Sequence, residues 1–440
     1  MQTLADWLAH LEGLHPKGQA GIELGLDRIR RVKDVLGQQQ HCPVIIVGGT
    51  NGKGSTCAYL ENILKHGGYK VGCYTSPHLL AYNERVRVDG RPIDDAALCA
   101  AFARVEAARL TAGTDGGPET LTYFEFGTLA AWEVFAAAGI EVAVLEIGLG
   151  GRLDAVNAYE PDISIVTGIA LDHTDWLGPD REAIGFEKAG IYRAGKPAFC
   201  ADPNPPQSLL DHAAAIGADL HLLGRDFGFE RPAAEASENR LQWRWWCKKD
   251  GQLLKRSLAY PGLRGPTQLL NASVALAALE ALTARLPVTM QAIRPGLIET
   301  ELAGRFQVLP GKPAIVLDVG HNPQAVAVLA GNLSNMGFFD RTHAVVGMLA
   351  DKDIAGALQP LKGRVDYWHL ATLDGPRGTA AEALAAIVAD GDLGGEVFCH
   401  PSPEAATEAA KGAAGESDRI LIFGSFLTVA GALRVLRPQS

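Results

Sequence analysis

The sequence predicts a two-domain α/β protein. Short apolar runs typical of buried parallel strands alternate with helical patterns through most of the 440 residues. A glycine-rich stretch, GGTNGKGST at residues 48–56, directly follows the first of these runs. A chain of this length is also too long for one ordinary hydrophobic core. We expect a phosphate-loop nucleotide-binding domain over residues 1–296, with a mostly parallel sheet and a β-hairpin region, and a smaller Rossmann-like α/β domain over residues 297–440.

Composition argues against several classes of protein. A net charge of -10 and a pI near 5.7 disfavour a nucleic-acid partner or an anionic membrane surface. No uninterrupted apolar run approaches the roughly 20 residues that a membrane span needs, and the N-terminus does not resemble a signal peptide. The seven cysteines are scattered without a CxxC pair, which is typical of thiols in a reducing compartment. We expect a cytoplasmic monomer with small-molecule partners, no nucleic acid and no membrane.

The first strand and helix flank a candidate phosphate loop. Residues 43–47 are apolar and β-branched, and residues 55–66 carry apolar side chains at helical spacing. Between them, glycines allow backbone N–H groups to surround an anion at the positive end of the helix. Lys53 adds a charge, and Ser55 or Thr56 can bind magnesium. The stretch departs twice from the usual GxxxxGK[ST] pattern, so a glycine-rich turn that only links strand to helix is the alternative.

Further strands of the first domain are expected at 142–147, 163–169 and 197–200, with a helix at 121–138. The segment 221–260 differs, because its residues alternate around a Lys249-Asp250-Gly251 turn. That pattern predicts a β-hairpin. Its cluster of three tryptophans could form a stacking site for a ligand, but packing on a half-buried hairpin is the commoner role. The residues of this cluster are Trp243, Trp245 and Trp246.

A second alternation of strands and helices begins near residue 312. It contains no GxGxxG motif, although its pattern is that of a small Rossmann-like domain. Polar loops are expected at 318–323 and 351–353, and the domain boundary is expected near 296–300. The predicted strands are 314–320, 343–349, 365–371, 395–400 and 419–424.

Polar residues follow several strands of the first domain. Glu146 ends one strand, His173 follows the strand at 163–169, and Ser76 follows the strand-like VGCYT. Lys188 lies on an expected helix downstream. Ligands of parallel α/β sheets gather at the carboxyl ends of strands, so a carboxylate, an imidazole and a hydroxyl beside a phosphate loop predict a site for a hard cation. Taken singly, each residue could instead be a helix cap, a salt-bridge partner or a satisfied polar group.

A series of motifs runs in one order through nearly the whole chain and leaves the hairpin region as the main unmatched part. On these motifs the chain resembles the folylpolyglutamate synthase/dihydrofolate synthase family of the Mur ligase superfamily. The matching stretches are GLDRI (25–29), GTNGKGS (49–55), TSPHL (75–79), NERV (83–86), TYFEFGT (122–128), LEIGLGGRLDAVN (145–157), LDH (171–173), EKAGI (187–191), LNASVAL (270–276), GRFQV (304–308), LDVGHNP (317–323), VGMLADKD (346–353) and GSFLTVAG (424–431).

The resemblance implies a role for each group of residues. The residues implied to bind ATP are Gly49, Thr50, Asn51, Gly52, Lys53, Gly54, Ser55, Asn271, Arg305, Asp318 and His321. The implied pterin pocket comprises Leu24, Gly25, Leu26, Thr122, Tyr123, Phe124, Glu125, Leu153, Asp154 and Ala155. The implied ligands of two magnesium ions are Ser55, Ser76, Glu146, His173 and Lys188, with Lys188 carbamylated. Lys53, Lys188 and His173 are the implied catalytic residues.

The implied reaction joins L-glutamate to dihydropteroate, and to the glutamate tail of reduced folates, through an acyl phosphate made with ATP. A peptidoglycan-precursor ligase of the same superfamily is one alternative, although the TSPHL and LDAVN stretches favour folate. A nucleotide-driven switch or binding protein is an alternative from another class. That reading leaves the LDVGHNP loop at 317–323 without a substrate.

Overall fold

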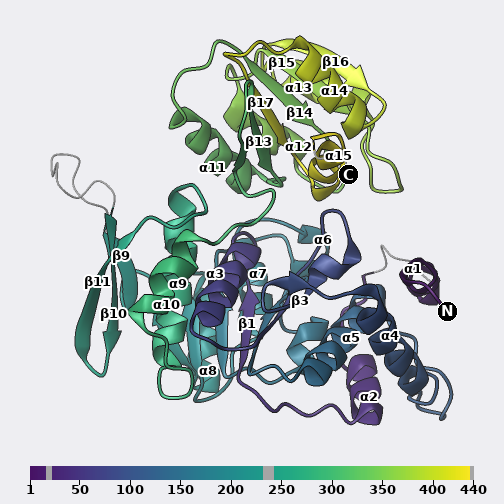
Figure 1. The fold of residues 1–440 in the computed structure, drawn as a ribbon, viewed down its shortest axis with the longest axis vertical. Helices are drawn as coiled ribbons and strands as arrows, with labels where there is room; N and C mark the ends of the chain where they lie inside the picture. The colour runs from purple at the N-terminus through teal and green to yellow at the C-terminus, as the bar shows by residue number, and fades with distance from the viewer. Residues whose placement is uncertain (16–21, 231–241, 437–440) are drawn as a thin grey trace. The chain divides into compact units, whose positions relative to one another are not determined.

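The computed structural model describes residues 1–15, 22–230 and 242–436 (Figure 1). Residue contacts divide the chain into two compact units. The first unit comprises Met1–Ile169, Leu177–Pro261 and Leu269–Thr300, and the second comprises Ala170–Trp176, Gly262–Gln268 and Glu301–Ser440. Each unit contains its own sheet and its own hydrophobic core.

The first unit is built on an eight-stranded sheet with the order β4-β3-β2-β5-β1-β6-β7-β8. The strands from β2 to β8 in this order are parallel to their neighbours, and β3 and β4 add an antiparallel edge. This arrangement confirms the mostly parallel sheet expected from the sequence. The strands are β1 (Val44–Gly48), β2 (Val71–Tyr74), β3 (Val86–Val88), β4 (Arg91–Pro92), β5 (Val142–Glu146), β6 (Ile163–Val166), β7 (Pro197–Cys200) and β8 (Asp219–Leu222).

Helices between these strands bury apolar side chains against the sheet. Trp132 of α5, for example, is almost fully buried and stacks on Tyr159 with 4.5 Å between ring centroids. The helices of this unit are α1 (Leu4–Leu14), α2 (Asp27–Leu36), α3 (Lys53–His66), α4 (Asp95–Arg109), α5 (Tyr123–Ala138), α7 (Arg181–Ala189), α8 (Gln207–Ile216), α9 (Pro266–Ala281) and α10 (Met290–Ile298). The short helix α6 (Thr174–Leu177) belongs mostly to the second unit by its contacts. Short 3-10 helices occupy Tyr82–Arg85 and Ala155–Ala158.

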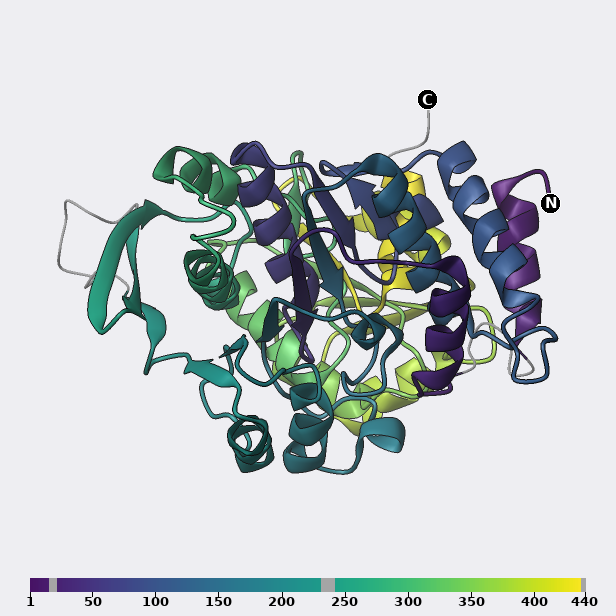
Figure 2. The same cartoon turned by 90° about the horizontal axis from the view of Figure 1, so that it is seen from below.

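A three-stranded sheet, β11-β10-β9, lies beside α9 and α10 and projects from the rest of the first unit (Figures 1 and 2). Its strands are β9 (Phe227–Glu230), β10 (Gln242–Lys249) and β11 (Gln252–Ala259). Asp250 and Gly251 join β10 to β11 with positive φ angles of 50° and 75°, which is the geometry of a type I′ hairpin turn. The predicted hairpin is therefore confirmed, while residues 231–241 of that region lie outside the described residues.

The tryptophans of this sheet serve packing. Trp243 and Trp245 are 0% and 1% exposed, and their indole N–H groups donate to the backbone oxygens of Ala259 and Ser273. Trp246 packs against Gly228, where an added Cβ would lie 2.9 Å from its ring. Because the two buried rings have no face open to solvent, the stacking-site alternative is wrong for them.

The second unit is a six-stranded sheet with the order β12-β13-β17-β14-β15-β16, in which only β12 is antiparallel to its neighbour. All five strands predicted for this region are present, and the smaller α/β fold is confirmed. The strands are β12 (Gln307–Leu309), β13 (Ala314–Asp318), β14 (Thr342–Val346), β15 (Tyr367–Ala371), β16 (Glu396–His400) and β17 (Arg419–Phe423). The helices are α11 (Pro323–Ser334), α12 (Ile354–Leu358), a 3-10 turn at Gln359–Leu361, α13 (Ala381–Asp390), α14 (Pro403–Ala413) and α15 (Phe426–Leu436).

One strand is shorter than expected. The predicted strand at 163–169 ends at Val166, because the backbone after it turns to other partners. The Gly168 carbonyl accepts the Thr50 N–H at 2.6 Å, and the Ile169 N–H donates to the Asp202 carboxylate at 2.7 Å. His173 therefore lies well beyond the strand end.

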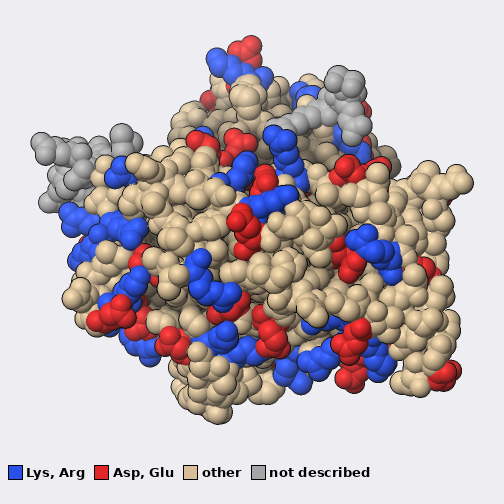
Figure 3. All heavy atoms as spheres, turned by 60° about the horizontal axis from the view of Figure 1, so that its bottom comes forward, with Lys and Arg blue, Asp and Glu red and all other residues tan. Residues whose placement is uncertain are grey.

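None of the described helices is long and apolar enough to cross a membrane. Acidic and basic side chains are interspersed on the face shown in Figure 3, so the net charge of -10 is not gathered into one patch there.

Candidate active site

The phosphate loop joins β1 to α3, and its shape depends on two glycines. Gly49 and Gly52 have φ angles of 137° and 95°, which residues other than glycine rarely adopt. The helix begins at Lys53, two residues earlier than predicted, so Lys53 stands at the positive end of α3. Its ammonium donates to the carbonyls of Gly49 at 3.1 Å and Thr50 at 3.3 Å. The charge is thus held over the loop whose N–H groups can bind an anion.

Thr167, which directly follows β6, fixes the other side of the loop. Its hydroxyl donates to the Asn51 carbonyl at 2.7 Å, and a Cβ at Gly49 would lie only 2.0 Å from the same Oγ1. The Thr167 side chain is 3% exposed overall. Thr167 was not predicted as a site residue, because the sequence placed it inside the strand expected at 163–169.

Asn271 of α9 packs against the same loop. A Cβ at Gly52 would lie 2.5 Å from Asn271 Oδ1, so only glycine allows this close approach. Asn271 is 7% exposed and belongs to the first unit. The structure therefore brings this predicted nucleotide contact beside the glycine at the start of α3.

The predicted metal ligands of the first unit gather at the carboxyl edge of its sheet. Strand β5, which ends at Glu146, lies between β1 and β2. The Glu146 carboxylate accepts the Ser76 N–H at 2.9 Å and is buried, as are Ser55 and Lys188. Gly151 brings the loop after β5 against the Lys188 backbone, where an added Cβ would lie 3.0 Å from the Lys188 carbonyl.

The donor set fits magnesium. Across the described ranges, no three His, Cys, Asp or Glu side chains form a metal-binding group. A closed protein cage is not what magnesium requires, because it is usually held by one or two carboxylates together with waters and substrate phosphates. One buried carboxylate, Glu146 at the end of β5, and one buried hydroxyl, Ser55 in the first turn of α3, are consistent with that pattern.

His173 has a different setting. It belongs to the second unit by its contacts and has a positive φ of 53°. Its Nε2 lies 3.4 Å from the Lys352 ammonium, which donates to Asp172 at 2.7 Å. The His321 Nε2 lies 3.6 Å from the other Asp172 oxygen. Burial raises the pKa of Asp172, but His321, His173 and Lys352 outweigh burial and leave that pKa well below its usual range. Lys352 was not predicted as a site residue.

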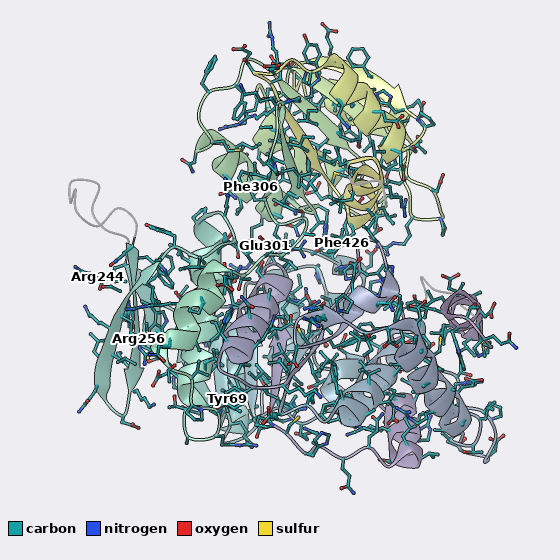
Figure 4. The ribbon with its side chains drawn as sticks, in the orientation of Figure 1. Tyr69, Arg244, Arg256, Glu301, Phe306 and Phe426 are labelled. Carbon is teal, nitrogen blue, oxygen red and sulfur yellow. The ribbon has the colours of Figure 1, made fainter. Side chains whose placement is uncertain are left out.

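The other predicted nucleotide contacts of the second unit also cluster. Asp318 accepts the N–H groups of Phe306 at 2.9 Å and Gly320 at 2.7 Å. Burial raises the pKa of Asp318, although these N–H groups and the charges of Arg305 and His321 oppose the rise. The Arg305 guanidinium lies 5.2 Å from the centre of the Phe426 ring, and Figure 4 labels Phe306 and Phe426 on this unit.

Three separate stretches predicted for the pterin pocket lie side by side. The Gly25 N–H donates to the Leu153 carbonyl at 3.2 Å. Phe124 packs against Gly148, where an added Cβ would lie 2.6 Å from the ring. Glu125 accepts the Thr122 N–H at 2.7 Å in a capping box at the start of α5. All of these contacts lie within the first unit.

Arg28, which was not predicted, joins two of these stretches. Its guanidinium donates to Glu125 at 3.1 Å and also contacts the Glu23 carboxylate. Burial raises the pKa of Glu125, while Thr122 and Arg28 act in the opposite direction. Helix α2 is thereby held against the start of α5 by an ion pair.

Asp154 organises the glycine-rich loop after β5. Its carboxylate accepts the Leu149 N–H at 2.8 Å and the Val156 N–H at 3.0 Å, and it is 3% exposed. Burial raises the pKa of Asp154 to about 7, although backbone N–H groups and the charge of Lys53 lower it. A carboxylate offers about four acceptor positions, so contact with a pterin ring would be additional to this structural role.

Known proteins place the chain in a family. Residues 304–426 match the family model of the Mur ligase glutamate ligase domain. The dihydrofolate synthase/folylpolyglutamate synthase of Escherichia coli (strain K12) is 44% identical over 434 residues, which cover 98% of this chain and 95% of that protein. The chain belongs to the dihydrofolate synthase/folylpolyglutamate synthase family.

Solved structures of this family share the fold. The E. coli FolC structure in complex with DHPP and ADP has a TM-score of 0.87 at 44% identity and covers 99% of this chain and 98% of that chain. A bifunctional folylpolyglutamate synthase/dihydrofolate synthase with Mn, AMPPNP and L-glutamate bound has a TM-score of 0.86 at 43% identity, with coverages of 99% and 98%. The resemblance inferred from the motifs is confirmed, the family makes this chain a ligase, and neither the peptidoglycan-ligase nor the switch alternative is favoured.

We expect Gly52→Ala to weaken nucleotide binding by at least about tenfold, or ~1.4 kcal/mol. The new methyl group would meet Asn271 Oδ1 at 2.5 Å and force the loop to move. Gly68→Ala is the matched control, because Gly68 has a φ of 86° with nothing within 4 Å of an added Cβ. Both variants should lose stability through backbone strain of about 1–2 kcal/mol. Calorimetric titration with AMPPNP should separate them, and equal affinities would contradict the assigned loop.

We expect Asp154→Asn to change the pH dependence of unfolding. The folded-state pKa of about 7 lies above the ordinary carboxyl value of 3.8, so the folded protein binds the proton more tightly and wild-type stability falls as pH rises between these values. The variant lacks this loss, which amounts to at most about 1.4 kcal/mol per pH unit. Its melting temperature relative to the wild type should therefore rise from pH 4 to pH 7 and level off above.

Asp94→Asn is the control for losing a helix cap, because Asp94 caps α4 from an exposed position. If the difference in melting temperature between wild type and Asp154→Asn stays constant over this pH range, burial does not raise the pKa of the Asp154 carboxyl.

Proposed function

We propose that the chain joins L-glutamate to dihydropteroate, and to the glutamate tail of reduced folates, through an acyl phosphate formed with ATP. The observation that carries this proposal is the placement of the pterin-pocket stretches in the same unit as the phosphate loop. Asp154, in the loop that contacts Gly25, is near enough to Lys53 for that charge to lower its pKa. A substrate carboxylate held by the pocket would thus face the phosphates. The ligands bound in the related structures, DHPP with ADP and L-glutamate with AMPPNP, support it.

The difficulty of the first step is electrostatic. A carboxylate must approach the γ-phosphate, and two like charges at about 4 Å repel by roughly 4 kcal/mol at an effective dielectric of 20. Lys53 and the N–H groups of the loop would offset this repulsion by neutralising the phosphates. The glutamate amine then attacks the acyl phosphate and expels phosphate. We therefore expect catalysis to rest mainly on positioning and charge.

Magnesium would add neutralisation of the phosphates and orient them when bound. In this proposal the residues of the first unit that hold magnesium are Ser55, Ser76, Glu146 and Lys188, and His173 is the predicted ligand of the second unit. A protonated lysine would repel the ion, so we propose that Lys188 is carbamylated. Lys188 is 4% exposed, and the neutral form of its amine is the form that reacts with CO2.

The remaining assignments follow from the same proposal. Asn271 would contact the nucleotide together with the phosphate loop, and Arg305, Asp318 and His321 are the predicted nucleotide contacts of the second unit. Residues 1–296 would form the ATP-binding domain and residues 297–440 the C-terminal ligase domain. A cytoplasmic location and a monomeric state stay predictions from the sequence.

A phosphate-release assay tests the proposed reaction. Release should require ATP, L-glutamate and a pteroate acceptor together, and both dihydropteroate and tetrahydrofolate should serve. Lys53→Ala should fold normally and lose nearly all turnover, because it removes the ammonium held over the loop. Lys65→Ala, an exposed lysine at the far end of the same helix, is the control. Phosphate release without an acceptor would contradict the ligase.

Carbamylation makes a separate prediction. Lys188→Ala should lose activity and regain part of it with added acetate or bicarbonate, because a free carboxylate can occupy the space of the missing one. Wild-type protein equilibrated with 13C-labelled CO2 should show a carbamate carbon signal in its NMR spectrum, and the variant should lack it. An identical spectrum in both proteins would show that Lys188 is unmodified.

A further inference from the structure

Arg87 of β3 forms a buried ion pair outside the site described above. Its side chain is 16% exposed and that of its partner, Glu61 of α3, is 8% exposed. The guanidinium donates from Nε to both Glu61 oxygens, at 3.2 Å to Oε1 and 3.0 Å to Oε2, and from Nη2 to Oε2 at 2.8 Å. Such forked geometry fixes the guanidinium plane as well as its position.

Nη2 of Arg87 also donates to Cys73 Sγ at 3.2 Å, and Nη1 reaches both sides of the segment that carries Ser76. Nη1 donates to the Thr75 hydroxyl at 2.9 Å and to the Glu84 carbonyl at 3.0 Å. Thr75 directly precedes Ser76. The Glu84 carboxylate accepts N–H groups of residues 79, 80 and 81. One side chain therefore holds the residue before the segment and the turn that closes it.

The ion pair connects this segment to the phosphate loop. Glu61 lies on α3, the helix that begins at Lys53, and the two residues are separated by eight positions, so they share a helix face. On the other side, the Ser76 N–H donates to Glu146 at 2.9 Å. A rigid path thus runs from the helix of the phosphate loop through Arg87 to the backbone that holds the Glu146 carboxylate.

We propose that Arg87 is a positioning residue for the metal and phosphate site, where it sets the Ser76 segment and Glu146 against the phosphate loop. This proposal rests on the proposed function for the identity of the ligands. A lysine could not replace the arginine, because a single ammonium cannot reach the carboxylate of Glu61 while keeping the planar fork to Thr75 and Glu84. Outer contacts of this kind typically change metal affinity by about 10–100-fold when removed.

The test measures Mn2+ binding to the AMPPNP complex by electron paramagnetic resonance, which needs no turnover. Arg87→Lys should weaken Mn2+ binding about tenfold while KM for dihydropteroate is unchanged. Glu61→Met combined with Arg87→Met should give the same loss without leaving an unpaired buried charge. Thr75→Val keeps the ion pair but removes the link to the segment, and it should show part of the effect.

Arg91→Lys is the control, because Arg91 is exposed on the neighbouring strand β4, and it should bind Mn2+ as the wild type does. Wild-type Mn2+ affinity in well-folded Arg87→Lys would overturn the proposal. The proposal would also be overturned if Arg87→Lys weakened Mn2+ and pteroate binding by the same factor and lowered the melting temperature. That result would mean that Arg87 stabilises the fold in general. If wild-type protein binds Mn2+ with AMPPNP but releases no glutamate-dependent phosphate, the proposed function fails and the inference about Arg87 is still decided by the binding data.

Discussion

The structure depends above all on the close packing around the phosphate loop. Gly49 and Gly52 approach Thr167 and Asn271 so closely that neither glycine could carry a side chain. Thr167 follows β6 and Asn271 lies on α9, so two elements far away in sequence fix the backbone of the loop. The Lys53 ammonium lies over this loop at the positive end of α3, where an anion could bind.

Buried carboxylates are used in a consistent way across the chain. Glu146 and Asp154 are buried and Asp318 is half-buried, and each accepts at least one backbone N–H group. Burial disfavours the charged form, and hydrogen bonds from N–H groups restore part of the lost solvation. These acids therefore order the loops that carry them in addition to any contact with ligands. The pKa values of Asp154 and Asp318 are raised, so at these two residues the effect of burial exceeds that of the hydrogen bonds.

Much of the fold could be predicted because its signals are local. The five parallel strands of the second unit and the Asp250-Gly251 turn were readable from apolar runs and turn chemistry. The end of β6 was not readable, since it is set by Thr50 and Asp202, which are distant in sequence. For the same reason, sequence patterns did not reveal Thr167, Arg28, Lys352 or the pairing of Arg87 with Glu61. Each acts through a partner on another element.

The sequence by itself determined the class of the fold, the phosphate loop and the family, because periodicity, glycine placement and an ordered series of motifs are properties of neighbouring residues. The tertiary structure decided which polar residues meet. The Gly25 backbone forms a hydrogen bond with Leu153, and Arg87 forms an ion pair with Glu61. The contacts of the His173 segment assign it to the second unit. Such contacts depend on the packing of whole elements in three dimensions, and a spacing along the chain does not encode the distance between two side chains that the fold brings together.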